Sequence, residues 1–282
     1  MGSRGFLFTF NDPYRVNVYA IDASEHLFIC DTYLGTEPMQ EVVKTLRGEG
    51  IAKPIIVFLS HADYDHIWGN GAFKEATIIA HVSCYERIHD QSTNDLERFK
   101  SHKRGTVELV EPNMLFSHEL LYPRDGIKIY HTPGHSRDSS SLYDAHDRTV
   151  FVGDNIEHPF PYLNDANFDE YLGSLQSYLD YNPSYVVSGH DPALNNTRLI
   201  RENLTYIESI QELNTDTGKF DERQLNIHTK NLFTIAESYK RQIKQEKYRY
   251  YESTFELLKE LPETEQVKNM KQKITQELGK TR

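Results

Sequence analysis

The chain has 282 residues, of which 38% are hydrophobic, and it contains 18 tyrosines and 14 phenylalanines. This length and composition support one sizeable hydrophobic core, or one core with an appendage, and exclude a disordered chain. The formal net charge of −11 argues against a nucleic-acid partner, because proteins bind phosphate backbones through clustered lysines and arginines.

The cysteine content and the apolar runs indicate the compartment. Cys30 and Cys84 are the only cysteines and show no paired spacing, which is typical of a reducing environment. The N-terminal sequence MGSRGFLFTF has too short an apolar run for a signal peptide, and no run reaches the roughly 18 apolar residues of a membrane span. We therefore expect a cytoplasmic protein that does not contact a membrane.

The first part of the chain combines strand and helix patterns. The segments RVNVYAI (15–21) and HLFICDT (26–32) are β-rich and flank the polar DASE, which predicts a hairpin. Apolar residues at helical spacing predict a helix over 36–48. The continuous apolar run IIVFL (55–59) is typical of a strand buried on both faces.

Further strand patterns follow, and several end in a histidine or an aspartate. Residues 83–104 are polar and predict a helical insertion. The expected strands are ATIIAH (76–81), the start of IKIYHTPGH (127–135), SLYD (141–144), TVFVGD (149–154) and SYVVSGH (184–190). Since open α/β sheets place their sites at the carboxyl ends of strands, these polar ends predict a functional site.

The character of the chain changes after Pro192. Apolar residues at helical spacing predict a helix over 199–213, and more helix follows from Leu225, interrupted at Pro262. We predict a catalytic domain over 1–217 and a helical C-terminal extension over 218–282. The apolar stripes of this extension pack either on the core or on a second subunit, which would give a homodimer; for residues 263–282 a solvated helix with a frayed end is the alternative.

The stretch HADYDH (61–66) carries the chemistry. Imidazole nitrogens and carboxylate oxygens are common ligands of Zn, Fe and Mn. In an extended segment residues i and i+2 point the same way, so His61 and Asp63 can approach one ion. Asp65 and His66 follow a turn and can serve a second ion. The other strand ends supply the remaining candidate ligands, which are His135, Asp154 and His190.

The motifs HADYDH, HTPGHSRDSSSLY, FVGDN and VVSGH, in this order, resemble the metallo-β-lactamase superfamily over about residues 14–213. The resemblance implies an α/β (α+β) fold, a four-layer αββα sandwich. It implies that two divalent metal ions bind, most often Zn, and that a metal-bridging hydroxide attacks the substrate. The implied ligands of the first ion are His61, Asp63 and His135, those of the second are Asp65, His66 and His190, and Asp154 bridges both; Asp65 and Asp154 are the implied catalytic carboxylates.

Asp63 departs from the superfamily motif HxHxDH, which most often has histidine at this position. Two divalent ions, three aspartates and one hydroxide are formally neutral, whereas histidine at 63 leaves one positive charge. The extra carboxylate lowers Lewis acidity and moves metal preference from Zn toward Mn or Fe. Flavodiiron oxygen or nitric oxide reductases also carry a carboxylate here, which makes a non-haem iron oxidoreductase or oxygenase the main alternative; the residues after 217 do not show the strand–helix alternation of the flavin domain of those proteins.

The predicted function is therefore hydrolysis of a small acyl substrate, such as a thioester, ester, lactone or amide; a phosphodiesterase is a further alternative. Asp31 is predicted to accept a hydrogen bond from a metal-bound histidine, or to serve a turn. Segments 83–104 and 155–172 and the C-terminal helices are expected to wall the pocket. Candidate substrate contacts are Arg137, which is otherwise a solvated turn residue paired with Asp138, and His158 and Tyr162 from the loop 155–165.

Overall fold

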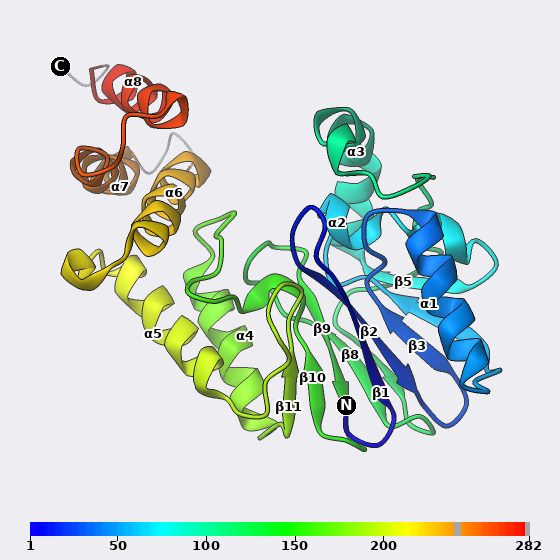
Figure 1. The fold of residues 1–282 in the computed structure, drawn as a ribbon. Coiled ribbons are helices and arrows are strands. Elements are labelled where there is room, and N and C mark those ends of the chain that lie inside the picture. The colour runs from blue at the N-terminus through cyan, green and yellow to red at the C-terminus, as the bar shows by residue number, and fades with distance from the viewer. Residues whose placement is uncertain (240–243, 280–282) are drawn as a thin grey trace.

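The computed structural model describes residues 1–239 and 244–279 and shows two facing β-sheets with helices on both outer sides (Figure 1). This arrangement confirms the expected αββα sandwich. The first sheet has the order β1-β2-β3-β4-β5-β6 and the second the order β11-β10-β9-β8-β7. The strands are β1 (Gly5–Phe10), β2 (Val16–Asp22), β3 (Leu27–Cys30), β4 (Ile55–Phe58), β5 (Thr77–His81), β6 (Met114–Phe116), β7 (Glu119–Tyr122), β8 (Ile127–His131), β9 (Ser140–Asp144), β10 (Thr149–Phe151) and β11 (Tyr185–Val187).

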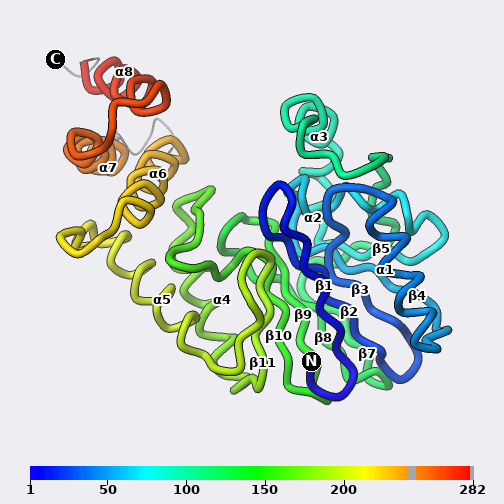
Figure 2. The backbone as a smooth tube through the Cα atoms, in the orientation of Figure 1, coloured from blue at the N-terminus to red at the C-terminus, as the bar shows by residue number. Residues whose placement is uncertain are grey.

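Helices cover the outer faces of both sheets. The backbone trace in Figure 2 shows α1 to α3 beside the first sheet and α4 and α5 beside the second. The helices are α1 (Thr36–Gly48), α2 (Tyr64–Ile67), α3 (Val82–Arg98), α4 (Phe168–Asp180), α5 (Arg198–Gln211), α6 (Glu222–Ser238), α7 (Lys244–Leu257) and α8 (Glu265–Gly279). Within the described residues, no helix has both the length and the apolar character needed to cross a bilayer.

Strand β2 shows why the sandwich has several hydrophobic layers. Val18 and Ala20 face the helices of the first sheet, whereas Tyr19 and Ile21 face the second sheet. All four side chains are fully buried, and alternate residues of a strand point to opposite faces, so both faces of the sheet are covered. Strand β4 is parallel to both of its neighbours, β3 and β5, which accounts for its continuous apolar sequence.

Most of the predicted elements are present. The hairpin is formed by β2 and β3, and α1 has the expected bounds of 36–48. The predicted polar insertion 83–104 contains α3, the expected strand 55–59 is β4, and the expected strands with a histidine or aspartate at their ends are β5, β8, β9, β10 and β11. Strands β1, β6 and β7 were not predicted; β1 pairs along its whole length with β2 at the edge of the first sheet.

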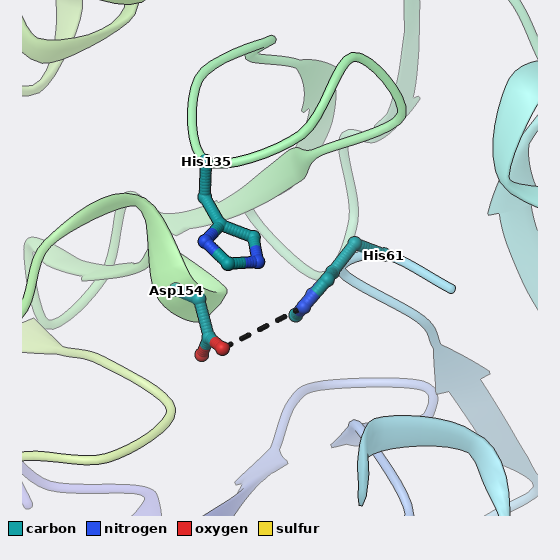
Figure 3. Close-up of side chains that lie close together, drawn as sticks. All are labelled: His61, His135 and Asp154. Atoms are coloured by element: carbon teal, nitrogen blue, oxygen red, sulfur yellow. Dashed lines mark ion pairs between the residues drawn. The ribbon is translucent and has the colours of Figure 1, made fainter. Parts of the chain in front are cut away.

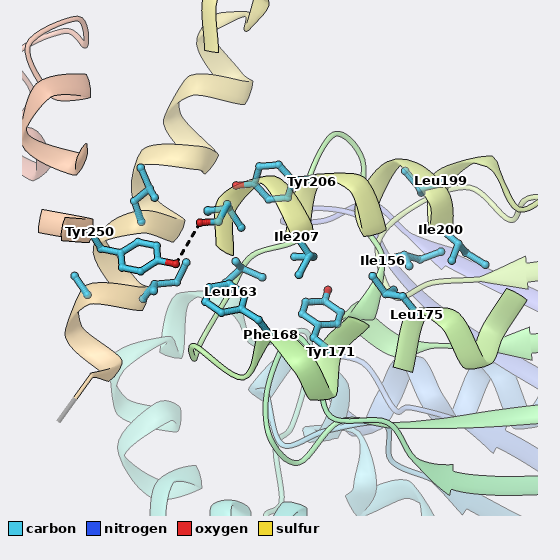
Figure 4. Packing of buried hydrophobic residues seen from close by; sticks show 14 of the residues in the cluster. Ile156, Leu163, Phe168, Tyr171, Leu175, Leu199, Ile200, Tyr206, Ile207 and Tyr250 are labelled. Carbon is cyan, nitrogen blue, oxygen red and sulfur yellow. Dashed lines mark hydrogen bonds between the residues drawn. The ribbon is translucent and has the colours of Figure 1, made fainter. Parts of the chain in front are cut away.

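The C-terminal helices pack on the rest of the chain. One hydrophobic cluster joins Tyr171 of α4 and Ile207 of α5 to Tyr250 of α7 (Figure 4). Ile274 of α8 belongs to the same cluster. The apolar stripes of the C-terminal helices therefore pack on the rest of the chain, as one of the two predictions stated. Residues 265–279 form a helix whose apolar side chains belong to this cluster, rather than a fully solvated helix. Residues 240–243 and 280–282 lie outside the described part of the chain. The domain boundary at 217/218 and a homodimer remain predictions.

Candidate metal centre

The seven predicted ligands come together at one end of the sandwich. The loop after β4 and the short helix α2 carry HADYDH, and the loop after β8 carries His135. Asp154 lies in the single helical turn Gly153–Asn155 that follows β10, and His190 follows β11. Figure 3 shows His61, His135 and Asp154 converging from three separate elements. The side chains come together because the strands that precede them end at the same side of the sandwich.

One group of donor atoms surrounds His61. The side-chain donor atoms of His61, His135 and Asp154 lie within 4.8 Å of one another. His61 Nε2 is 3.6 Å from Asp154 Oδ2 and 3.6 Å from Asp63 Oδ2. His135 Nε2 is 3.3 Å from the same oxygen of Asp63. Asp63 therefore presents one oxygen to this group, as its place in the motif predicts.

A second group contains Asp65, His66 and His190, whose donor atoms also lie within 4.8 Å of one another. Asp65 Oδ2 is 3.7 Å from His66 Nε2 and 3.5 Å from His190 Nε2. Asp154 Oδ2 lies 3.3 Å from His66 Nε2 and 3.1 Å from His190 Nε2. Since this oxygen also approaches His61, Asp154 is the residue that both groups share.

These spacings match the edges of a tetrahedral metal site. Zn ligands lie about 2.0–2.1 Å from the ion, so tetrahedral donors are roughly 3.3–3.4 Å apart. The measured histidine-to-carboxylate separations of 3.1–3.7 Å bracket this value, and the donor atoms of each group lie within 4.8 Å of one another. In addition, His61 Nε2, His66 Nε2 and Asp154 Oδ1 are buried without any hydrogen-bond partner. Buried polar atoms that lack a partner are costly, so these donors fit a metal ion.

Hydrogen bonds at the other ring nitrogen orient all four histidines. The four contacts at Nδ1 are His61 to Ser60 Oγ at 2.9 Å, His66 to Asp31 Oδ2 at 2.7 Å, His135 to the carbonyl of Tyr162 at 2.8 Å, and His190 to the carbonyl of Arg15 at 2.5 Å. A carbonyl or carboxylate accepts the Nδ1 proton of three of these rings, and the Ser60 hydroxyl, which donates to Asp31, can accept that of His61. Each Nε2 then keeps its lone pair toward the centre. The expected hydrogen bond from a candidate ligand, His66, to the Asp31 carboxylate is thus present.

The carboxylates control the proton affinity of the histidines. Burial disfavours the charged imidazole of His135, but the Asp63 carboxylate outweighs burial and raises its pKa to about 9. Burial likewise opposes charging of His190, but Asp154 raises its pKa to about 10. Metal binding must displace these protons, because only the neutral imidazole is a ligand.

Close approach of the backbone depends on Gly189. A Cβ atom at this position would lie 2.1 Å from Asp154 Oδ1 and 2.8 Å from His66 Cε1. Both neighbours are candidate ligands held by the surrounding fold, so neither can move away without disturbing the centre. A larger residue would therefore collide with the candidate ligands, which explains why glycine precedes the histidine in the SGH motif.

Asp63 is held by an arginine that sequence analysis did not identify. Arg87 of α3 donates through Nη2 to Asp63 Oδ1 and through Nη1 to Asp138 Oδ1 at 3.0 Å. Asp138 Oδ2 accepts the backbone N–H of Ala62 at 2.8 Å, which ties the arginine to the ligand loop. Burial opposes ionisation of Asp63, but the Arg87 guanidinium holds its pKa well below the ordinary range. The arginine therefore offsets the additional negative charge at position 63.

A cavity of about 750 Å³ opens above the centre. As expected, its walls come from the segments 83–104 and 155–172 and from α6. Tyr162, one of the three candidate substrate contacts, is part of this lining, and its contact with a substrate stays a prediction. Arg137 and His158 are not in this lining within the described chain: Arg137 donates to Asp165 instead of pairing with Asp138, and His158 borders a different cavity.

Glu157 also lines the cavity, although the motifs gave no reason to select it. Its side chain is buried, and its backbone N–H and carbonyl are both bound by the Asn203 side chain of α5. Burial raises the pKa of the Glu157 carboxyl to about 8, and the charge of Asp154 adds to this effect. Its position three residues after Asp154, in a buried loop, is the only sequence signal that could have indicated it.

The fold and this centre together define a metal-dependent hydrolase of the αββα type. The sequence profile of the metallo-β-lactamase superfamily matches residues 11–190, and the chain belongs to this superfamily. The fold implies divalent metal ions, and the two groups of donor atoms are the candidate sites for them.

Relatives and solved structures agree with this assignment. The acyl-coenzyme A thioesterases MBLAC2 of Bos taurus and Homo sapiens are 23% and 22% identical to this chain, and each match covers 68% of this chain and 79% of the relative. A metallo-β-lactamase from Pontibacter korlensis has a TM-score of 0.58 and 15% identity, covering 74% of this chain and 96% of its own. DIM-1 metallo-β-lactamase has a TM-score of 0.57 and 16% identity, covering 74% and 95%. These two structural similarities concern the fold alone.

Proposed function

We propose that this protein is a dinuclear metallohydrolase that cleaves acyl thioesters. The observation that carries the proposal is the convergence on Asp154 Oδ2 of the Nε2 atoms of His61, His66 and His190, at 3.6, 3.3 and 3.1 Å. A donor atom of His135 lies within 4.8 Å of donor atoms of His61 and Asp154. His61, Asp63 and His135 would hold one ion, Asp65, His66 and His190 the other, and Asp154 both. Zn is the proposed metal, because imidazole-rich tetrahedral sites favour it.

Two divalent ions held by these residues would supply an activated hydroxide and polarisation of the substrate carbonyl. The chain's own residues position these groups: the Nδ1 hydrogen bonds fix the histidine rings, and Gly189 lets the backbone approach Asp154. A thioester is favoured over a lactone or an amide because both acyl-coenzyme A thioesterase relatives align over 79% of their length. The cavity of about 750 Å³ is large enough for an acyl chain and part of its carrier.

The test is a hydrolysis screen of the metal-stripped protein after reconstitution with Zn, Mn or Fe(II). The substrates are acyl thioesters, lactones, phosphodiesters and β-lactams with one matched chromogenic or thiol readout for each class. We expect thioester turnover with Zn, and its loss in Asp154→Asn. Turnover confined to phosphodiesters would replace the thioester assignment with the phosphodiesterase alternative.

An iron oxidoreductase or oxygenase is the second candidate, and Asp63 is the residue that favours it. A carboxylate ligand is hard and suits iron or manganese. Stoichiometric iron in the purified protein, oxygen uptake, and no ester or thioester turnover would establish this alternative and exclude the hydrolase.

A further inference from the structure

Three cationic side chains border the cavity above the metal centre from opposite sides. Arg98 comes from the last turn of α3, and Arg223 and Lys230 come from α6. All three residues are exposed to solvent. We call these three residues the cationic rim. They bring a positive border to the site of a chain whose formal net charge is −11.

Within the described residues the rim charges form no close ion pair, although Asp95, Asp191 and Glu157 interact electrostatically with Arg98, Arg223 and Lys230, respectively. Arg223 donates to the carbonyl of His158 at 3.1 Å, and Lys230 Nζ lies 4.5 Å from the centroid of the Tyr162 ring. Arg98 lies above the Phe99 ring at 4.9 Å. Across residues 1–239 and 244–279, none of the three has a carboxylate oxygen within 4 Å of its charged end, although the chain has 42 acidic residues.

The rim residues also influence one another across the cavity. Partial burial lowers the pKa of the Lys230 ammonium; the Glu157 carboxylate opposes this shift, and the Arg98 guanidinium adds to it. Like charges held near one another without a counter-ion are unfavourable, and an anion placed between them relieves the repulsion.

Three acidic residues of the cavity lie deeper than the rim, whereas another, the half-buried Asp95 of α3, lies in the lining near Arg98. Asp65 and Asp154 are 6% exposed and face the histidines, and Glu157 is 9% exposed. Two further arginines, Arg15 and Arg87, belong to the lining, and Arg87 is bound by Asp63 and Asp138. The cavity therefore has an acidic floor suited to metal cations and a basic border suited to an anion.

We propose that the cationic rim binds phosphate on the carrier part of the substrate, so that the enzyme selects thioesters of a phosphorylated carrier over neutral thioesters. This inference rests on the proposed thioesterase function. Two guanidinium groups and one ammonium match a phosphate, because arginine donates two parallel hydrogen bonds to its oxygens and lysine adds a point charge. A single carboxylate would leave part of this charge unmatched. The rim also gives α6 a role in the site, since it supplies two of the three cations.

The test compares two substrates with the same acyl group and the same scissile bond. One is an acyl-coenzyme A, and the other is the corresponding acyl-pantetheine, which lacks the phosphates. We expect the metal-loaded enzyme to show a higher kcat/KM for the coenzyme A thioester by at least about tenfold at low salt, and this preference to shrink as salt screens the rim.

The double variant Arg98→Gln/Lys230→Gln should lower the ratio of the two kcat/KM values by roughly tenfold or more, through KM. The control is Lys219→Gln, because Lys219 is 88% exposed and lies outside the cavity lining; its ratio should equal that of the parent enzyme. Equal kcat/KM values for the two substrates in the parent enzyme, or an unchanged ratio in the double variant, would overturn the inference while leaving thioester hydrolysis intact.

A binding measurement separates this inference from the proposed function. Desulfo-coenzyme A, which has no thiol to ligate a metal, is titrated calorimetrically into the full-length metal-loaded protein and into the double variant. Binding that weakens by roughly tenfold in the double variant supports the rim even if no thioester is hydrolysed. Absence of binding, or equal binding by both proteins, refutes it.

Discussion

The contact between Arg87, Asp63 and Asp138 leads to a quantitative prediction for Arg87→Met. Methionine keeps an unbranched apolar stem and removes the guanidinium that both carboxylates share. Asp138 is only 4% exposed, so it would lose its counter-ion in a place that water barely reaches. The metal-free protein should therefore become less stable.

The magnitude follows from distance and exposure. A pair at 3.0 Å attracts by about 5 kcal/mol at an effective dielectric constant of 20, before desolvation is subtracted. Removing one partner of a fully buried pair costs about 3–5 kcal/mol, and exposed pairs contribute about 0–1 kcal/mol. Since the side chains of Arg87 and Asp63 are 26% and 24% exposed, we expect a loss of about 2 kcal/mol in the free energy of unfolding.

A double-mutant cycle isolates the pair. Asp63→His removes the carboxylate that Arg87 binds, so the two substitutions should be non-additive by about 1 kcal/mol or more. The assay is urea unfolding in EDTA at pH 7, followed by circular dichroism and by the fluorescence of Trp68. The control is Arg137→Met, because Arg137 is 62% exposed and its partner is Asp165. Additivity within about 0.5 kcal/mol, or an equal loss in the control, would refute the reasoning.

The same pair should govern metal choice. Arg87 offsets the charge of Asp63, so Asp63→His should raise the Zn content relative to Mn and Fe, and Arg87→Met should shift it the opposite way. Dialysis against equimolar Zn, Mn and Fe(II), followed by elemental analysis, measures both shifts. An unchanged metal profile in Asp63→His would mean that the carboxylate does not control metal preference.

Three further substitutions examine the centre. Asp154→Ala should reduce metal content toward one ion and lower activity by about a hundredfold or more, because both groups of donors share its oxygen; two ions at full activity would show that the ligand assignment is incorrect. Asp31→Asn should weaken metal binding by about 10–100-fold, since Asp31 orients His66; chelator competition measures this, and parent-like affinity would contradict it. The pKa of Glu157 is raised to about 8, above its value in the unfolded chain. Its contribution to the free energy of unfolding is therefore complete below pH 4.5 and is lost as the pH rises through 8. In EDTA, the free energy of unfolding of Glu157→Gln should therefore rise by at least about 1 kcal/mol relative to that of the parent between pH 5 and pH 9. A difference between the two proteins that stays constant with pH would count against this pKa.

The candidate ligands could be selected from the sequence because each lies in the loop or short helical turn that follows a strand. A buried strand is a local pattern of apolar residues, and the carboxyl ends of strands in such folds meet at one end of the molecule. The sequence around His61, His135, Asp154 and His190 therefore contained both the chemistry and the approximate location. The structure brings the side chains of these predicted ligands within a few ångströms of one another.

Other parts depended on contacts that no local pattern reveals. Strand β1 consists of the short apolar run GFLFTF near the N-terminus, and only its pairing with β2 makes this run a strand. Arg87 lies on a polar helix whose sequence is typical of a solvated surface, and its role exists only because α3 packs over the ligand loop. The prediction that residues 83–104 line the pocket identified this segment, but the sequence could not show that Arg87 is the residue that contacts Asp63.

Metal chemistry and substrate recognition therefore depend on different elements of this fold. The floor of the cavity consists of strand ends whose positions are fixed by the two sheets, and Gly189 shows how little space is left there. The rim consists of side chains from α3 and α6, which are exposed and make few contacts. Exposed side chains tolerate exchange at small cost in stability. Changes at Arg98, Arg223 or Lys230 should thus alter which carrier is accepted without changing the number of bound metal ions. Substrate preference can therefore diverge at the rim while the candidate metal ligands stay the same.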